Sequence, residues 1–394
     1  MADARAKGVV ILDGARTPFG KFGGALRDHT ATDLGVFAAR AAIERAGVSA
    51  KDVDHVIFGN ALQTSSDAIY LARHIGLRAG VPQSAPGLAL NRLCGSGFQS
   101  IITGAQMLLL DEASFVLAGG TESMSQAPHV IRGARWGMDL GHGKLEDSLW
   151  EALTDSYCNM AMAHTAENLA IKYGITREQA DEFAYQSQMK TKLATESGRL
   201  AEEIVPFNIA LQHDEHPRPG TTRAVLAAMQ PAFQKNGVVT AGNASGICDG
   251  AAAVLLTTEA KARANQLKPL AKILSWGITG CDPAIMGIGP VSAIRAALER
   301  AHLSLEQIDL IEVNEAFAAQ YLAVERELGL DRDRVNVNGG AIALGHPLGA
   351  TGARIIVTLM YELKRRQARL GIGSACIGGG QGIALLIENI RQAV

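Results

Sequence analysis

An internal repeat is the feature that most restricts how this chain can fold. Residues 42–62 (AIERAGVSAKDVDHVIFGNAL) align without a gap on residues 297–317 (ALERAHLSLEQIDLIEVNEAF), with seven identities at a constant offset of 255. Each copy is predicted to form the end of a helix, a turn with a serine cap and a buried strand. The same offset carries Gly97 onto Gly352, each at the start of an apolar helical pattern. An offset that holds through helix, turn and strand predicts two homologous α/β halves.

Strand-like and helix-like segments alternate in both halves, which predicts mainly parallel sheets. The part between the halves differs, because it is polar, rich in glycine and contains a proline-bearing loop. Such a long insertion on one half only predicts a segment that carries binding residues. We therefore expect three units: an N-terminal half of residues 1–121 and 246–270, an inserted segment of residues 122–245, and a C-terminal half of residues 271–394.

The composition restricts the partners and the compartment. A net charge of −2 over 394 residues argues against a general affinity for nucleic acid or for an anionic membrane. No apolar run approaches the ~18 residues of a membrane span, and the start of the chain does not have the pattern of a targeting signal. The five cysteines are scattered and odd in number, unlike a disulfide framework. We expect a cytoplasmic protein that binds neither nucleic acid nor membrane.

One cysteine lies where a loop is predicted to turn into a helix. Cys94, in LNRLCGSGFQS, directly precedes an apolar helical pattern. Free N–H groups and the helix dipole favour an anion at such a place, which is expected to lower the pKa of the thiol. A lone cysteine is, however, more often a buried packing residue than a nucleophile. Both interpretations stay open from this segment alone.

Three segments of the C-terminal half could complete a site. His346 lies in the glycine-rich loop GGAIALGHPLGATG, which the repeat makes equivalent to the loop of Cys94, so a pseudo-twofold axis would bring the two loops together. Cys376 precedes three glycines that would expose backbone N–H groups, and Asn314 follows a predicted strand. No C-x₂-C or H-x₃-H spacing is present, so we expect no metal site.

Four segments then resemble a known family. NRLCGSG, NEAFA, GHPLGATG and CIGGGQG are similar to the signature motifs of the thiolases, in the family's order, and the resemblance covers essentially the whole chain. SSDAIYLARH, CGSGFQS and KLEDSLW are most similar to the mitochondrial-type 3-ketoacyl-CoA branch. The resemblance implies an α/β thiolase fold, with duplicated βαβ halves in five αβαβα layers and an inserted loop domain that binds CoA.

The resemblance also implies an activity and roles for the site residues. The expected reaction is CoA-dependent cleavage of 3-ketoacyl-CoA to acetyl-CoA and a shortened acyl-CoA, as in fatty acid β-oxidation, and the reverse Claisen condensation. Cys94 would take the acyl group after His346 assists its deprotonation. His346 and a water held by Asn314 would stabilise the enolate, and Cys376 would exchange a proton with acetyl-CoA. The backbone amides of Cys94 and Gly378 would form the oxyanion hole.

Substrate contacts and assembly follow from the same resemblance. The residues expected to bind substrate are Arg218, Ser245, Met162 and Met286. Coenzyme A is expected as a substrate, with no tightly bound cofactor, and the chain as a homodimer or homotetramer. Two segments depart from relatives: the loop of residues 205–214 is short and has no lysine, and Ala161-Met162-Ala163-His164 replaces the His-Met-Gly of short-chain biosynthetic thiolases.

Alternative functions stay open at this point. An acetyl-CoA acetyltransferase that forms acetoacetyl-CoA would use the same motifs. A ketoacyl synthase is disfavoured because Cys376 is present in CIGGGQG. A non-catalytic acyl-CoA-binding protein is disfavoured because Cys94, His346 and Cys376 are all intact.

Overall fold

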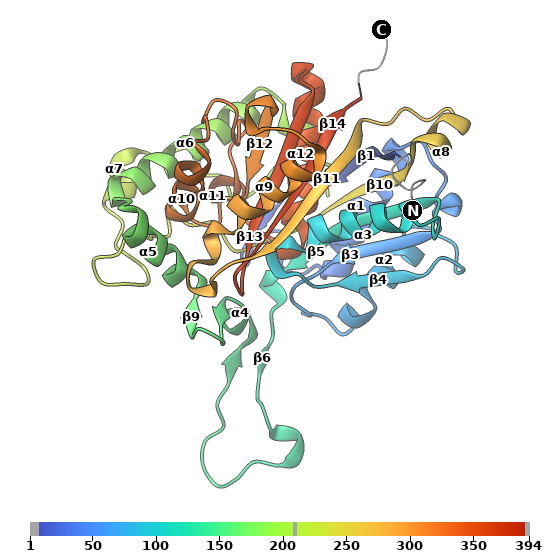
Figure 1. Ribbon diagram of the computed structural model, residues 1–394. Coiled ribbons are helices and arrows are strands. Elements are labelled where there is room, and N and C mark those ends of the chain that lie inside the picture. The colour runs from blue at the N-terminus through green and yellow to red at the C-terminus, as the bar shows by residue number, and fades with distance from the viewer. Residues whose placement is uncertain (1–7, 208–210, 391–394) are drawn as a thin grey trace.

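A single central sheet of ten strands runs through the computed structural model, which describes residues 8–207 and 211–390 (Figure 1). The N-terminal strands lie on one side of the sheet and the C-terminal strands on the other, and they meet where β1 pairs with β11. The order across the sheet is β12 (Leu310–Val313), β13 (Leu370–Ile377), β14 (Gln381–Asn389), β11 (Ala271–Gly280), β1 (Val9–Arg16), β10 (Cys248–Thr258), β5 (Phe115–Ser123), β3 (His55–Gly59) and β4 (Gly87–Leu90), with β2 (Gly20–Lys21) beside β10.

The internal repeat is visible in the elements themselves. β3 begins at His55 and β12 at Leu310, and β5 begins at Phe115 and β13 at Leu370, so both pairs keep the offset of 255. β5 and β10 are antiparallel neighbours, as are β13 and β14. A turn of three glycines joins the second pair, whereas residues 124–247 join the first. The inserted segment therefore takes the place of a tight turn, although the division into three units remains a prediction.

The expectation of mainly parallel sheets is wrong. β3 pairs in parallel with β4 and β5, and β12 with β13, but every ladder that involves β1, β10, β11 or β14 is antiparallel. Parallel neighbours need a crossover, usually a helix, whereas β14 returns directly after β13 through a turn. The alternation of helix and strand patterns predicted the crossovers correctly but gave no signal for these returning strands.

Helices make five layers with the two parts of the sheet. The central layer holds α3 (Ser96–Leu109) and α12 (Leu348–Arg366), which contact each other, β5, β10 and β13. The outer layer of the N-terminal half holds α1 (Ala31–Arg45) and α2 (Leu71–Arg78), and that of the C-terminal half holds α9 (Gly289–Ala301) and α10 (Ala318–Leu328). Shorter helices are α8 (Glu259–Ala264) and α11 (Ala341–Leu344).

The two central helices touch through the glycines that the repeat pairs. A Cβ atom added at Gly97 would lie 2.5 Å from the backbone N of Ala353, and one at Gly352 would lie 2.3 Å from the backbone N of Phe98. Only glycine allows the two backbones to approach so closely. The loops that precede these helices therefore face each other, as the repeat predicted.

The inserted segment forms a hairpin and a group of helices. Its elements are β6 (His129–Val130), β7 (Glu146–Asp147), α4 (Ser148–Ala152), β8 (Thr154–Asp155), β9 (Met160–Ala161), α5 (Met162–Tyr173), α6 (Arg177–Glu196) and α7 (Arg223–Ala227). The residues between β6 and β7 project far from the body, while α5, α6 and α7 lie beside α10 (Figure 1). No helix in the described part of the chain has the length and apolar character that a membrane crossing requires.

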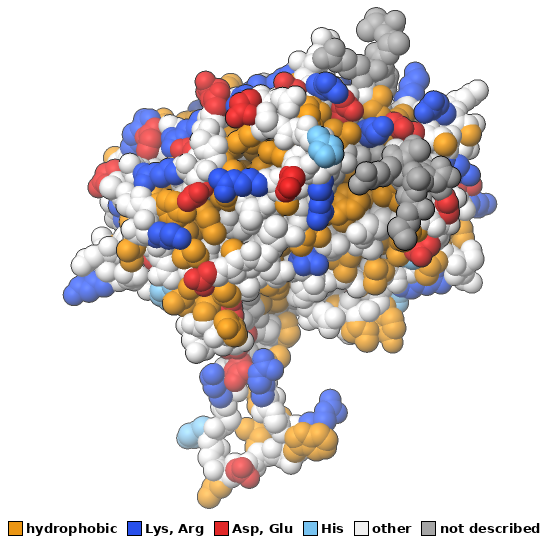
Figure 2. Space-filling model, in the orientation of Figure 1, with side chains coloured by type: hydrophobic (Ala, Val, Ile, Leu, Met, Phe, Trp, Pro, Cys, Tyr) orange, Lys and Arg blue, Asp and Glu red, His pale blue; other side chains and the backbone are white. Residues whose placement is uncertain are grey.

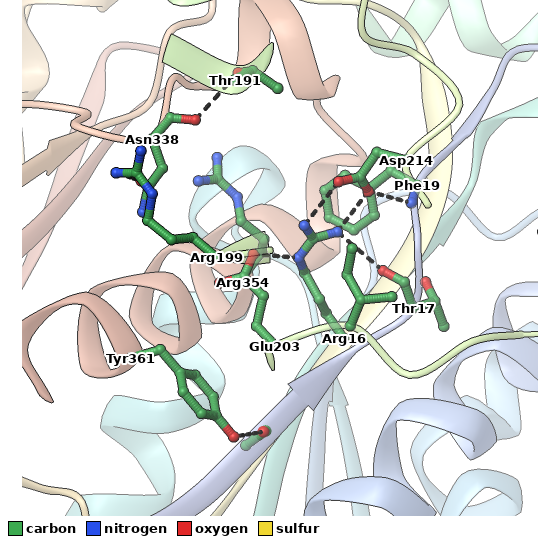
Figure 3. Close-up of polar contacts among 12 residues, drawn as sticks. Arg16, Thr17, Phe19, Thr191, Arg199, Glu203, Asp214, Asn338, Arg354 and Tyr361 are labelled. Carbon is green, nitrogen blue, oxygen red and sulfur yellow. Dashed lines mark hydrogen bonds and ion pairs between the residues drawn. The ribbon is translucent and has the colours of Figure 1, made fainter. Parts of the chain in front are cut away.

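A buried arginine fastens the inserted segment to the N-terminal half. Arg16, at the end of β1, donates from Nε to Glu203 (2.7 Å) and from both terminal nitrogens to Asp214 (2.6 and 2.8 Å), as Figure 3 shows. The inserted segment also contacts the C-terminal half, where Thr191 of α6 donates to the carbonyl oxygen of Asn338 (3.2 Å). The segment is therefore held by both halves of the molecule.

Candidate active site

The turn that carries Cys94 is held in a costly backbone conformation. Residues Leu93–Gly95 form a single turn of 3₁₀-helix directly before α3. Leu93 has a φ of 48°, a conformation that costs a non-glycine residue about 1–3 kcal/mol. Surrounding contacts must maintain it, and Leu93 packs against the core between the two halves. The turn places the thiol ahead of the first free N–H groups of α3.

Cys94 opens into a cavity of about 360 Å³ with mostly apolar walls. The structure brings together here five of the residues predicted from the sequence: Cys94, His346, Ser245, Met162 and Met286. They come from both halves and from the inserted segment. Sequence reasoning missed the apolar side chains that form most of the remaining wall: Phe22, Met124, Leu149, Trp150, Phe233, Phe317 and Leu348. Their only sequence signal is that four of them lie inside the quoted segments NEAFA, GHPLGATG and KLEDSLW: Phe317, Leu348, Leu149 and Trp150.

His346 is fixed by contacts at three positions. Its backbone N–H donates to the carbonyl oxygen of Gly246 (3.0 Å), at the end of the inserted segment. Its Nδ1 lies 2.6 Å from Oγ1 of Thr351, and its Nε2 lies 3.4 Å from Nδ2 of Asn314. Burial and the positive charge of Arg354 lower the pKa of His346 to about 3. The imidazole is therefore neutral at physiological pH and can accept a proton.

The thiol of Cys94 is protonated in the free protein. Burial raises its pKa to about 11, and the charge of Glu122 adds to this effect. The backbone N–H groups of Gly378 and of Cys94 itself favour the thiolate and oppose the shift. The expectation that the helix start lowers this pKa is corrected, because desolvation outweighs the N–H groups. Attack by Cys94 therefore requires a base, and the same N–H groups lie where an oxyanion can be stabilised.

Cys376 lies at the end of β13, buried beside Met286 and Ala316. Burial raises the pKa of Cys376 well above its ordinary value, and charge on Cys94 raises it further. In the turn that follows, Gly379 and Gly380 have φ values of +78° and +76°, which favour glycine. Cys376 is therefore a thiol that can donate a proton next to Cys94.

Gly378 brings the glycine turn against the turn of Cys94. A Cβ atom at this position would lie 3.2 Å from Cδ1 of Leu93 and 3.3 Å from Sδ of Met162. The absence of a side chain at Gly378 therefore lets the two turns pack closely, and the backbone N–H of Gly378 lies within hydrogen-bonding reach of Cys94.

Asn314 contributes a free buried acceptor. Its backbone N–H donates to the carbonyl oxygen of Ser374 (2.9 Å), which fixes the residue at the end of β12. Its side-chain Oδ1 is buried and has no hydrogen-bond partner among the described residues. A buried acceptor without a partner costs free energy, so a molecule bound in the site is expected to donate to it.

Arg218 is the one predicted substrate contact that the structure does not bring to the cavity. Its side chain is exposed, and its backbone N–H donates to Oε1 of Gln188 (2.9 Å). Its contact with CoA remains a prediction. The short loop of residues 205–214 falls partly outside the described residues, because residues 208–210 are not described.

Comparison with known proteins covers both halves. The family description "Thiolase, N-terminal domain" matches residues 9–260, and "Thiolase, C-terminal domain" matches residues 267–389. The human protein named 3-ketoacyl-CoA thiolase, mitochondrial, is 55% identical over 98% of this chain and 99% of its own length. The acetyl-CoA acetyltransferase of Pseudomonas aeruginosa is 51% identical over 96% of this chain and 98% of its own. The crystal structure of human mitochondrial 3-ketoacyl-CoA thiolase in complex with CoA superposes with a TM-score of 0.97, at 56% identity over 98% of each chain.

These relatives correct the expected compartment. The similar proteins of human, cattle and rat, at 55%, 54% and 53% identity, are all named as mitochondrial. They contradict the prediction of a cytoplasmic location. Charge and hydropathy gave the wrong result because they separate membrane proteins from water-soluble ones but do not distinguish one aqueous compartment from another.

Proposed function

Because the chain belongs to the thiolase family, we propose that Cys94, His346, Asn314 and Cys376 carry out the family's reaction at the cavity described above. Cys94 and His346 line this cavity, Cys376 packs behind its wall against Met286 and Ala316, and Asn314 contacts His346. The chain has the thiolase fold and is an acyltransferase that uses coenzyme A as a substrate. Its reaction is thiolytic cleavage of 3-ketoacyl-CoA and the reverse condensation. The observation that carries the assignment of residues is that one cavity joins a protonated Cys94 to a neutral His346.

The first half-reaction transfers the acyl group to the protein. As Sγ of Cys94 attacks the 3-keto carbon, Nε2 of His346 takes the thiol proton. The N–H groups of Cys94 and Gly378 hold the oxyanion, and each such donor contributes roughly 3 kcal/mol. The bond between C2 and C3 then breaks and leaves the enolate of acetyl-CoA.

The enolate is stabilised and then protonated. His346 and a water on Oδ1 of Asn314 hold the enolate oxygen, and Cys376 gives its proton to C2, which releases acetyl-CoA. In the second half-reaction, the thiol of a new CoA attacks the acyl group on Cys94. That thiol's proton returns to Cys376, the bond between the acyl carbon and Sγ of Cys94 breaks, and His346 gives its proton back to this sulfur. The shortened acyl-CoA then leaves. These two steps predict ping-pong kinetics.

Within the family, we propose that this protein is a 3-ketoacyl-CoA thiolase and that it accepts substrates whose acyl chain is longer than the acetoacetyl group. Support comes from the cavity wall near Cys94, where Met124, Leu149 and Leu348 form one apolar cluster with Leu62. The alternative is acetoacetyl-CoA formation, and it is supported by the 51% identity to the Pseudomonas enzyme. The two are distinguished by the ratio of kcat/KM for a medium-chain 3-ketoacyl-CoA to kcat/KM for acetoacetyl-CoA. A ratio above one supports the first proposal, and a ratio below one supports the alternative.

We also propose that the chain forms a homodimer or homotetramer. β4 is an edge strand in which Gly87, Leu88 and Ala89 are exposed, and an exposed edge is a template for pairing with another strand. The hairpin between β6 and β7 exposes Trp136, Met138 and Leu140 away from the body (Figure 2). Apolar side chains gathered on such a projection indicate an interaction surface.

The assignment of the nucleophile is tested by acylation. Incubation with acetyl-CoA followed by intact-mass measurement should give one acetyl adduct per chain, and peptide mapping should place it on Cys94. Cys94→Ala should give no adduct. Cys158→Ala, which removes another half-buried cysteine, should behave as the wild type. An adduct that persists in Cys94→Ala would refute the proposal.

A further inference from the structure

The hydroxyl of Thr351 contacts the side of His346 that faces away from Asn314. Thr351 lies in the first turn of α12 and is fully buried. Its Oγ1 is 2.6 Å from Nδ1 of His346 and 3.1 Å from the carbonyl oxygen of Pro347, one turn back. These two contacts use the hydroxyl both as a donor and as an acceptor.

The two contacts together fix the direction of both hydrogen bonds. The carbonyl oxygen of Pro347 has no proton, so the hydroxyl hydrogen of Thr351 must point to it. Oγ1 can then act only as an acceptor toward His346, which requires a proton on Nδ1. The other ring nitrogen agrees, because the amide nitrogen of Asn314, 3.4 Å from Nε2, can donate but not accept.

We propose that Thr351 is a positioning residue that holds His346 in the Nδ1–H tautomer, which leaves Nε2 unprotonated, as a base for Cys94 requires. The inference rests on the proposed role of His346 as the base for Cys94. The tautomer decides whether that role is possible. With Nδ1–H, Nε2 takes the proton of Sγ as the new S–C bond forms, and Thr351 continues to accept from Nδ1 of the imidazolium.

Without the hydroxyl, a proton on Nδ1 loses its buried partner, and an unpaired buried donor costs about 1–3 kcal/mol. That cost favours the other tautomer, in which Nε2 carries the proton and donates it to Oδ1 of Asn314 once this amide turns, because Oδ1 has no other partner among the described residues. Nε2 then cannot accept a proton from Cys94. Attack must then use the thiolate that forms by loss of the proton to solvent. That fraction is small at neutral pH, because the pKa of Cys94 is about 11.

The two situations differ in their pH dependence. The groups that face His346 are the guanidinium of Arg354 on α12, the thiol of Cys94, and Cys248 of β10, whose Sγ lies beneath Gly345. Between the pKa of His346, about 3, and that of Cys94, about 11, neither the base nor the nucleophile titrates. Two buried carboxyls beside them do: burial raises the pKa of Glu122, which acts on Cys94, to about 7, and that of Glu312, which pairs with Arg354, to about 8. Both carboxyls are present in every variant compared, so they affect all the profiles alike. Base-assisted acylation therefore shows no tenfold-per-unit rise from about pH 5 to 9. Acylation through free thiolate rises about tenfold per pH unit.

The test compares Thr351→Val, Thr351→Ser and Thr358→Val. Thr358 is a second buried threonine on α12, and its hydroxyl has no hydrogen-bond partner among the described residues. Single-turnover acylation by acetyl-CoA is measured from about pH 5 to 9. Thr351→Val should be about 10²-fold slower near pH 7 and should gain the tenfold-per-unit slope, with KM for CoA within about twofold of the wild type. Thr351→Ser and Thr358→Val should keep the wild-type rate and the flat profile.

Two outcomes of this comparison would overturn the inference. One is a pH profile of acylation in Thr351→Val that is as flat as that of the wild type. The other is a loss of acylation rate in Thr351→Ser as large as the loss in Thr351→Val. If Thr351→Val does not fold, ¹⁵N NMR of histidine-labelled wild type decides, with the His346 signals identified as those lost in His346→Asn. A proton on Nε2 in the resting enzyme would refute the proposal. If the wild type is not acylated on Cys94 at all, the proposed function fails instead, so the two failures are distinguishable.

Discussion

At the scale of single residues, burial sets the protonation states of the reactive side chains. It raises the pKa of Cys94 to about 11 and lowers that of His346 to about 3. Both shifts keep the proton on sulfur, so the resting site holds a neutral thiol and a neutral imidazole rather than an ion pair. In the proposed mechanism, the cysteine becomes a strong nucleophile only while His346 removes its proton during attack. This arrangement protects the thiol between turnovers.

Cys376→Ser should separate the two halves of the reaction. Cys376 is a buried thiol whose pKa is raised well above its ordinary value, and its proposed task is to exchange a proton with acetyl-CoA. Acylation of Cys94 by a 3-ketoacyl-CoA breaks the bond between C2 and C3 before that proton is used, and it should keep its rate. Thiolysis and condensation should fall by about 10²-fold or more, because a serine hydroxyl is a much weaker acid. Intact-mass kinetics measure the first step, and steady-state assays measure the second.

The matched control is Cys281→Ser. Cys281 is a half-buried cysteine near Cys376, and its Sγ lies 3.8 Å from the carbonyl oxygen of Met286. We expect both activities to survive this change. Equal loss of acylation and thiolysis in Cys376→Ser would contradict the role given to Cys376.

At the scale of elements, the contact between α3 and α12 sets the distance between Cys94 and His346. Gly352→Ala would place a Cβ atom 2.3 Å from the backbone N of Phe98, which no side-chain rotation relieves. The helices must move apart, and overpacking of this kind costs about 1–3 kcal/mol. Urea unfolding should show that loss of stability, together with a lower kcat because the two loops separate.

Gly220→Ala is the control for that substitution. Gly220 lies in an exposed turn, its φ is not positive, and a Cβ atom there would meet no atom within 4 Å. Its free energy of unfolding should stay within about 0.5 kcal/mol of the wild type. If Gly352→Ala unfolds at the same urea concentration as the wild type, the packing of α3 against α12 does not depend on this contact.

A buried carboxylate at the end of β5 joins the two halves beside the site. One oxygen of Glu122 accepts from Nδ2 of Asn60 (2.7 Å) and from the backbone N of Leu62 (2.9 Å). The other oxygen accepts from the backbone N of Ala61 (2.9 Å) and of Gly349 (2.8 Å), in the first turn of α12. Glu122 therefore connects the loop after β3 to the helix that follows His346.

Glu122→Gln replaces one of these acceptor oxygens with a donor. Two of the four N–H groups then face an NH₂ group, and each unsatisfied buried donor costs about 1–3 kcal/mol. We expect a lower free energy of unfolding by urea and a lower kcat. Glu112→Gln, an exposed glutamate just before β5, should change neither. Equal behaviour of the two variants would show that the hydrogen bonds of Glu122 contribute little.

The parts of the fold and the site that could be predicted from the sequence are those marked by a local motif or by the internal repeat. Gly97 and Gly352 could be paired because they share the offset of 255, and Cys94, His346 and Cys376 could be found because each lies in a motif. The contacts of Glu122 and Thr351 could not be predicted, because they depend on the orientation of single side chains in the folded molecule. The direction of the pKa shift of Cys94 was missed for the same reason, since burial is set by residues remote in sequence.

At the scale of the whole molecule, the inserted segment replaces a three-residue turn and completes the site. The C-terminal half turns from β13 to β14 through three glycines, and the N-terminal half uses the equivalent place to insert residues 124–247. Arg16 ties that segment to β1, and Gly246 at its end accepts from the backbone of His346. In the proposed mechanism the duplicated halves thus differ in function: one supplies Cys94 and the insertion, and the other supplies the groups proposed to move protons.

The projecting hairpin is the proposed assembly surface, and it lies away from the proposed active site. Its apolar tip lies far from the body in Figure 1, and Trp136 and Leu140, both highly exposed, do not line the cavity of Cys94. Replacing both with serine removes apolar area that a partner subunit would bury, at about 25 cal/mol per Å². Sedimentation velocity should therefore show a smaller assembly at low protein concentration, while kcat per chain stays within about twofold. Leu110→Ser, an exposed leucine just after α3, should leave the assembly unchanged. An unaltered mass distribution in the double variant would place the subunit contacts elsewhere, with the exposed edge of β4 as the next surface to test.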